Sequence, residues 1–159
     1  MKKHIKIVVI AVILFCGIKS SAQTNINFTG KWLFNSKKSV FGNASANSEM
    51  DELTIRQTSD SISLTGKKGE QTAYALNGTP VSRKVQDSVI LVGSYQKSEG
   101  GALLKKQTYF SLQQRALATV EEEWHLSPDQ KELIISRTVK ANEPDQPVTT
   151  VKAVYDKQW

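Results

Sequence analysis

Alternation of apolar and polar side chains over short stretches is the feature of this sequence that most constrains its fold. In Phe28–Phe34, the side chains of Phe28, Trp32 and Phe34 fall on one face of an extended strand. The same period of two recurs along the chain, and no stretch keeps the period of an amphipathic helix over a useful length. The pattern therefore predicts a nearly all-β domain.

Turn-forming sequences divide the chain into short strands. Ser59-Asp60 has the chemistry of a tight turn, and Asn77-Gly78 is the strongest two-residue hairpin signal. We expect Asn77-Gly78 to join the strand that contains Tyr74 to the strand Val81–Val85. Many short strands with short turns predict an antiparallel meander that closes into a barrel of about 8–10 strands, because closure removes unpaired edges.

Residues 1–22 are organised like a secretory signal peptide. Lysines precede the apolar run Ile7–Cys16, and Ser20-Ser21-Ala22 supplies a small-residue cleavage site. The run is too short to cross a bilayer, which needs about 20 apolar residues. We therefore expect cleavage after Ala22, a single domain at residues 23–159, and a periplasmic or secreted protein.

Cys16 leaves a second route of processing open, because a cysteine after an apolar run can be lipidated. Lipoprotein signals carry a small residue immediately before the cysteine, whereas Phe15 stands there. We expect contact with a membrane only if Cys16 is lipidated. The C-terminal Trp159 resembles the last residue of outer-membrane barrels, but short strands with scattered lysines do not form the continuous apolar outer band of such a barrel.

Cleavage after Ala22 would also remove charged and reactive side chains from the chain. The 21 basic residues fall to 17, against 15 acidic ones, when the four lysines of residues 1–22 leave. A net charge of about +2 without a basic stripe predicts no binding to nucleic acid. Cys16 is the only cysteine and His4 is one of two histidines. We therefore expect no disulfide, no thiol nucleophile, no metal site and no cofactor.

Residues that could act in catalysis are few. His125 stands near Ser127 at the entrance of a turn, where neighbouring side chains do not form an oriented nucleophile–base pair. The chain has no Gly-x-Ser-x-Gly motif and no phosphate-binding loop. We expect a protein that is not an enzyme.

Glu122 is the carboxylate that remains as a candidate. It shares a strand face with Val120 and Trp124, so it points inward while its two glutamate neighbours point outward. Its usual fate would be a pair with a cross-strand base such as Arg137 or Lys106. A hydrolase or isomerase that uses Glu122 with Arg137 or Tyr109 is the rival hypothesis, and a strongly raised pKa of Glu122 would support it.

Aromatic side chains from separate strands are the better candidates for a binding site. A closed barrel could direct several of them into one lumen, and small residues such as Gly30, Ala75 and Gly93 would leave room there. The alternative is that the aromatic side chains fill a solid core. The candidate ligand-binding residues are Trp32, Phe34, Tyr74, Tyr109, Trp124, Arg137 and Tyr155.

Five short segments resemble the lipocalin-like secreted bacterial proteins. They are Gly30–Trp32, Asn35–Gly42, Glu123–Asp129, Leu133–Ile135 and Val154–Lys157. The resemblance implies that Trp32 closes the floor of a barrel and that an arginine from a late strand packs over it. Arg137 is the candidate, and a cation over an indole contributes about 0.5–2 kcal/mol.

These observations lead to a hypothesis about function. We expect a secreted or periplasmic binding protein that takes a small, mostly apolar ligand in its lumen. The alternative is a structural or interaction protein of the bacterial cell envelope, with a solid core and no ligand, whose working surface includes the segment Asn35–Asp51. An exposed apolar patch outside the barrel would favour that alternative.

Overall fold

The computed structural model describes residues 26–42, 51–66, 71–143 and 145–159. The predicted signal peptide, its cleavage site after Ala22 and the candidate lipidation site Cys16 lie outside these ranges.

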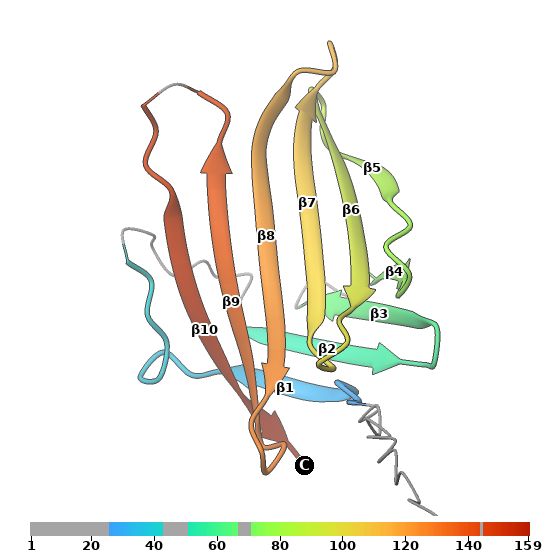
Figure 1. The fold of residues 1–159 in the computed structure, drawn as a ribbon, viewed down its shortest axis with the longest axis vertical. Helices are drawn as coiled ribbons and strands as arrows, with labels where there is room; N and C mark the ends of the chain where they lie inside the picture. Colours follow the sequence, from blue (N-terminus) through green and yellow to red (C-terminus); the bar gives the residue numbers. More distant parts are fainter. Residues whose placement is uncertain (1–25, 43–50, 67–70, 144) are drawn as a thin grey trace, which may run out of the picture.

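The described residues form ten antiparallel β-strands and no helix, which confirms the predicted all-β fold (Figure 1). The strands are β1 (Gly30–Phe34), β2 (Glu52–Gln57), β3 (Ser61–Gly66), β4 (Gln71–Ala75), β5 (Val81–Gln86), β6 (Val89–Lys97), β7 (Leu103–Ser111), β8 (Ala116–Leu126), β9 (Glu132–Ala141) and β10 (Thr149–Gln158).

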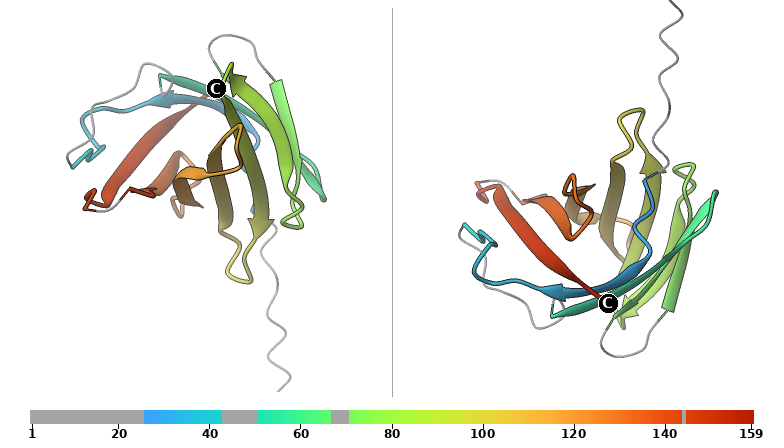
Figure 2. Two further views of the ribbon diagram at one scale, coloured as in Figure 1. Left: turned by 90° about the horizontal axis from the view of Figure 1, so that it is seen from above. Right: turned by 90° about the horizontal axis from the view of Figure 1, so that it is seen from below.

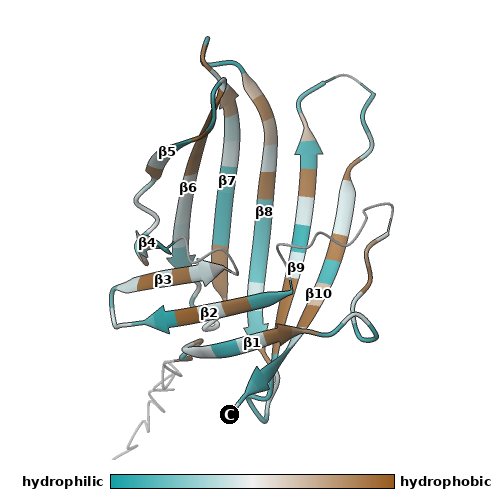
Figure 3. Cartoon of the chain, turned by 180° about the vertical axis from the view of Figure 1, so that it is seen from behind, coloured by the Kyte–Doolittle hydropathy of each residue, from teal (hydrophilic) through white to brown (hydrophobic). Residues whose placement is uncertain are grey.

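The strands form because apolar residues recur at every second position, as β8 illustrates. The half-buried Val120 and the buried Trp124 point inward, whereas Glu121, Glu123 and His125 between and beside them are exposed. Figure 3 shows the resulting bands of opposite hydropathy along the strands. Each long strand therefore has an inner face, which includes the core, and an outer face toward solvent.

A single sheet of order β4-β3-β2-β1-β10-β9-β8-β7-β6-β5 curls into a nearly closed barrel. Strands that follow one another in the chain are neighbours in the sheet, except β4 and β5, which lie at its two ends. The pairing of β1 with β10 joins the two parts of the chain, with Trp32 opposite Lys157. The two ends of the sheet meet at β6, because β5 pairs with it and Asn77 forms an isolated bridge with Gln96. This is the predicted meander closed into a barrel.

The predicted hairpin at Asn77-Gly78 is wrong. Gly78 has the positive φ of 83° that an Asn-Gly turn needs, but the strands on either side, β4 and β5, do not pair with each other. The backbone groups of this segment bond instead to β6, since the Gly78 N–H donates to the Tyr95 carbonyl at 2.8 Å and the Lys97 N–H donates to the Leu76 carbonyl at 3.3 Å. The segment carries the chain from one edge of the sheet to the other.

The core lies at the lower end of the barrel as Figure 1 is drawn. There β1, β2 and β3 cross the long strands β6–β10, and Figure 2 shows the curved cross-section from both ends. The largest fully buried side chains come from both groups of strands, which indicates that the core is the contact between them. They are Phe28, Trp32, Ile55, Ile62, Tyr95, Leu103, Trp124 and Leu133.

Above this core the long strands continue without a covering layer. In Figure 3 the upper parts of β6–β9 have no strand in front of them, whereas β1–β3 cross their lower parts. The inner face of the long strands is thus divided into a covered lower part and an open upper part.

Candidate functional site

The open part of the inner face is apolar. Register places Tyr109 opposite Ala118, and Val120 opposite Val139, on the same face as the core residues below them. These four side chains are half-buried, and Leu91, opposite Tyr109 on β6, is buried. We call Leu91, Tyr109, Ala118, Val120 and Val139 the upper inner face.

A row of charged side chains separates the upper inner face from the core. Lys105 on β7, Glu122 on β8 and Arg137 on β9 are direct cross-strand neighbours. Glu122 Oε1 lies 2.6 Å from Arg137 Nε, and Glu122 Oε2 lies 3.1 Å from Lys105 Nζ. The side chains of Glu122, Lys105 and Arg137 are 1%, 12% and 23% exposed, so the cations reach solvent and the carboxylate does not. We call these three residues the charged row.

Glu122 is held as a carboxylate. Burial alone would raise its pKa, but the charges of Lys105 and Arg137 and a hydrogen bond from Trp124 Nε1, at 2.8 Å, outweigh burial and hold the pKa below its usual range. A general acid at neutral pH needs a raised pKa. The structure therefore gives no support to the rival hypothesis in which Glu122 acts as an acid.

The pKa of Lys105 is lowered, because for this residue the effect of burial outweighs that of the neighbouring carboxylate. Burial lowers its pKa most, Glu122 raises it, and the positive charges of Arg137 and Arg83 lower it further. Arg83 lies on the inner side of β5, opposite Leu91, and its Nη1 lies 3.3 Å from Thr72 Oγ1. The carboxylate of Glu122 is thus shared by Lys105 and Arg137.

Tyr95 lies directly beside the charged row, opposite Lys105. Its ring packs edge-on against Trp124 and tilted against Tyr74, with centroid distances of 5.7 and 4.7 Å. The side chain is 1% exposed, and its hydroxyl has no hydrogen-bond partner among the residues that the structure describes. A buried hydroxyl without a partner costs about 1–3 kcal/mol.

The predicted aromatic set is divided between core and open face. Trp32, Tyr74, Trp124 and Tyr155 are buried in the core, and burial raises the pKa of Tyr155 to about 12. Phe34 is half-buried against Tyr155, with ring centroids 5.5 Å apart.

Tyr109 and Arg137 are the two members of the set that reach the open part of the inner face. Gly93 was one of the small residues expected to leave room for a ligand, but neighbouring side chains occupy the space beside it. A Cβ there would lie 3.4 Å from Gln107 Cγ and 3.5 Å from Tyr74 Cε1.

The expected packing of Arg137 over Trp32 is wrong. The cation above the Trp32 ring is Lys157, whose Nζ lies 5.3 Å from the ring centroid. Lys157 is the cross-strand neighbour of Trp32 on β10, whereas Arg137 is the neighbour of Glu122 on β8. The Trp32 Nε1–H donates to the Phe28 carbonyl at 3.0 Å, which satisfies the indole in the core.

Lys105 and Tyr95 were missed in the sequence. The expected partner Lys106 lies on the outer face, where its Nζ is 3.3 Å from Glu121. The signal that would have found Lys105 is its position two residues after the core residue Leu103 on β7, which places both side chains on the same face. The other expected partner of Glu122, Arg137, is confirmed.

A groove of about 460 Å³ lies on the other side of the same strands. Its lining side chains Gln96, Leu104, Glu121 and Glu123 alternate with the inward residues, and all four residues are exposed. Its ion pairs are those of solvated side chains, which contribute little. Lys105 and Glu122 of the charged row also contribute to the lining of this groove.

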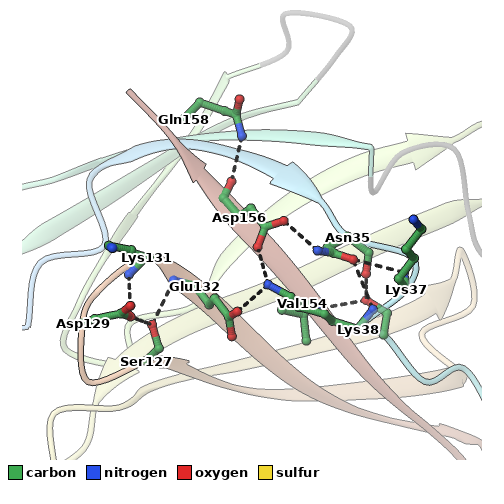
Figure 4. Close-up of polar contacts among 11 residues, drawn as sticks. Asn35, Lys37, Lys38, Ser127, Asp129, Lys131, Glu132, Val154, Asp156 and Gln158 are labelled. Carbon is green, nitrogen blue, oxygen red and sulfur yellow. Dashed lines mark hydrogen bonds and ion pairs between the residues drawn. The ribbon is translucent and has the colours of Figure 1, made fainter.

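The segments that carry the lipocalin resemblance meet at the lower end of the barrel (Figure 4). Asn35 Nδ2 donates to Asp156 Oδ2 at 2.7 Å, and Lys38 Nζ lies 2.6 Å from Glu132 Oε1 and 3.1 Å from Asp156 Oδ1. Ser127 Oγ donates to Asp129 Oδ1 at 2.6 Å in the neighbouring turn. These residues connect the chain after β1 to β9 and β10, so their role is structural.

Compared with known protein families and with curated proteins, the chain matches no family model and no curated sequence. No helix of the described part is long and apolar enough to cross a membrane. Within the same ranges, no group of three His, Cys, Asp or Glu side chains is placed to hold a metal ion.

Proposed function

We propose that this protein is a binding protein that works outside the cytoplasm and holds a small, mostly apolar ligand against the upper inner face. The observation that carries the proposal is the division of the inner face. Below the charged row, apolar side chains are covered by β1–β3, and above it Tyr109, Val120 and Val139 are only half-buried. An apolar surface that stays accessible in a folded protein marks a place where something binds.

The barrel shape supports this proposal, since barrels of this size hold one small ligand at an open end. The resemblance to lipocalin-like proteins points the same way. Export rests on residues 1–22, whose basic, apolar and small-residue regions are typical of a signal peptide.

The test is a fluorescence titration with N-phenyl-1-naphthylamine, a neutral apolar dye that brightens in apolar surroundings. We expect the protein to bind the dye, and the double variant Tyr109→Ser/Val139→Thr to bind it about tenfold more weakly, because two apolar contacts are lost. Leu104→Ser is the matched control, since Leu104 is a 41% exposed apolar residue on the outer face of β7. Equal binding by the double variant and the wild type would contradict the proposal.

The same titration addresses the alternative of an envelope interaction protein with a solid core. In that case the upper inner face would be only the upper margin of the core, and the dye would not bind there.

A further inference from the structure

We propose that the free edge of β5 is a docking site for an extended, acidic segment of another protein, which adds to the sheet as a further strand. The inference concerns a surface other than the upper inner face and does not depend on the ligand proposed above. Main-chain hydrogen bonds to the edge would supply affinity, and the side chains that flank the edge would supply specificity.

The first observation is the position of β5 in the sheet. It is the last strand of the sheet and pairs with β6 alone, whereas β4 lies at the other end. Figure 1 shows β5 at the outer margin of the long strands. Its register with β6 is regular over residues 81–84 and shifts between Lys84 and Gln86. One side of residues 81–84 therefore presents main-chain N–H and C=O groups that no neighbouring strand of the described sheet pairs with.

The second observation is that neither face of β5 is covered. All six residues of the strand are exposed, including Val81 and Arg83 on the side that continues the inner face. Val81 and Val85 are 36% and 37% exposed. An incoming strand would therefore meet apolar side chains toward both ends of β5, and its own apolar side chains could pack against them.

The third observation is the charge beside this edge. Strands β5 and β6 contain Arg83, Lys84 and Lys97 and no acidic residue. Arg83 Nη1 lies 3.3 Å from a neutral group, the Thr72 hydroxyl, and the pair of Lys84 with Asp87 is exposed at both residues. Consecutive residues point to opposite faces of a strand, so an acidic side chain on either face of an added strand would lie beside Arg83 or Lys84.

The same charges argue against a second copy of this chain as the occupant. If the β5 strands of two copies paired antiparallel about a two-fold axis, Arg83 and Lys84 of one copy would lie beside the same residues of the other. Like charges directly opposite each other destabilise a strand pair. Cations on an edge strand thus disfavour pairing with a copy of itself and favour an acidic partner.

The experiment uses two fluorescein-labelled peptides of equal length, in which valine alternates with glutamate or with lysine. Fluorescence anisotropy measures their binding to the full chain. We expect wild-type protein to bind the glutamate peptide at least about tenfold more tightly than the lysine peptide. The double variant Arg83→Glu/Lys84→Glu should reverse this order, because carboxylates then replace both cations beside the edge.

Arg56→Glu is the matched control for the double variant. Arg56 is also an exposed cation on a strand, but its strand, β2, has a neighbour on each side. This variant should keep the preference for the glutamate peptide. Thermal unfolding of all variants shows whether the fold is retained.

Hydrogen–deuterium exchange of wild-type protein then locates the peptide without any substitution. We expect the amides of residues 81–86 to exchange more slowly when the glutamate peptide is bound, because the N–H groups of the free edge become hydrogen-bonded. The amides of β2, which already has two neighbouring strands, should exchange at the same rate with and without the peptide.

Several results would overturn the inference. Wild-type protein would bind neither peptide or both equally, or the preference for glutamate would survive in the double variant. Binding without slower exchange in β5 would place the peptide elsewhere. A dimer of the free protein with slow exchange in β5, detected by sedimentation, would assign the edge to a second copy. Binding of the neutral dye is measured separately, so the proposed function stands or fails independently of these results.

Discussion

The carboxylate of Glu122 joins three neighbouring strands of the barrel. It is 1% exposed, it pairs with Lys105 on β7 and Arg137 on β9, and it accepts a hydrogen bond from Trp124 on its own strand. A buried charge is tolerated only when its partners compensate the loss of water. The stability of the inner face therefore depends on this single side chain more than on any exposed ion pair.

Glu122→Gln tests this dependence. The amide keeps the shape but removes the negative charge that Lys105 and Arg137 share, so we expect a loss of about 3–5 kcal/mol in the free energy of unfolding. Urea unfolding at pH 7 measures the loss. Glu121→Gln is the control, because the pair of Glu121 with Lys106 is exposed and should contribute less than about 1 kcal/mol. Similar losses in the two variants would show that burial of Glu122 does not matter.

At the scale of elements, the segment between β4 and β5 determines how the barrel closes. Leu76 and Gly78 exchange backbone hydrogen bonds with β6, and Asn77 bridges Gln96. This short pairing connects the end of the sheet formed by β4 to the end formed by β5, at the lower part of the barrel. Closure is thus local, and β5 itself is exposed along its whole length.

Gly78→Ala should weaken this closure. At a φ of 83° an L-residue is strained, so we expect a destabilisation of about 1–2 kcal/mol, measured by thermal or urea unfolding. Gly100→Ala is the matched control, since a Cβ at Gly100 would meet no heavy atom closer than the Ser98 Oγ at 3.9 Å. If the two alanine variants unfold alike, the turn at Gly78 is not under the expected constraint.

For the whole molecule, the charged row predicts a loss of stability in acid. The pKa of Glu122 in the folded state lies below the value of 4.5 expected of the unfolded chain. The contribution of Glu122 is therefore complete above about pH 4.5 and is lost as the pH falls through the folded-state pKa.

Comparison of wild type with Glu122→Gln isolates this contribution. The lowered pKa values of Asp129 and Asp156 also reduce stability in acid, but they act in both proteins and cancel in the difference. We expect the difference in the free energy of unfolding between wild type and Glu122→Gln to shrink from pH 7 to pH 3. A difference that stays constant over this range would refute the assignment.

The sequence predicted local features well and the choice of strand partners poorly. Alternation along a strand depends only on neighbouring residues, so the inward direction of Glu122 and its pairing with Arg137 were predictable. Lys105 was missed because a shift of one residue moves a side chain to the other face, and Lys106 was the residue considered. Asn77-Gly78 turns the chain as its residue types require, but which strands it joins depends on β6.

The proposed binding surface could not be located from the sequence for a similar reason. Trp32, Trp124 and Tyr109 all lie on inner faces, and alternation along a strand indicates only that a side chain points inward. What separates them is where β1–β3 cross the long strands, so that Trp32 and Trp124 are covered and Tyr109 is not.

The pairing of β1 with β10 also determines how the molecule can be attached to something else. It places β1 and the C-terminus together at the lower end of the barrel, whereas the upper inner face lies toward the other end (Figure 1). A linker, an affinity tag or a surface joined to the chain beside β1 or after Trp159 would leave the upper end unobstructed. Immobilised protein should therefore offer the proposed ligand the same access as protein free in solution.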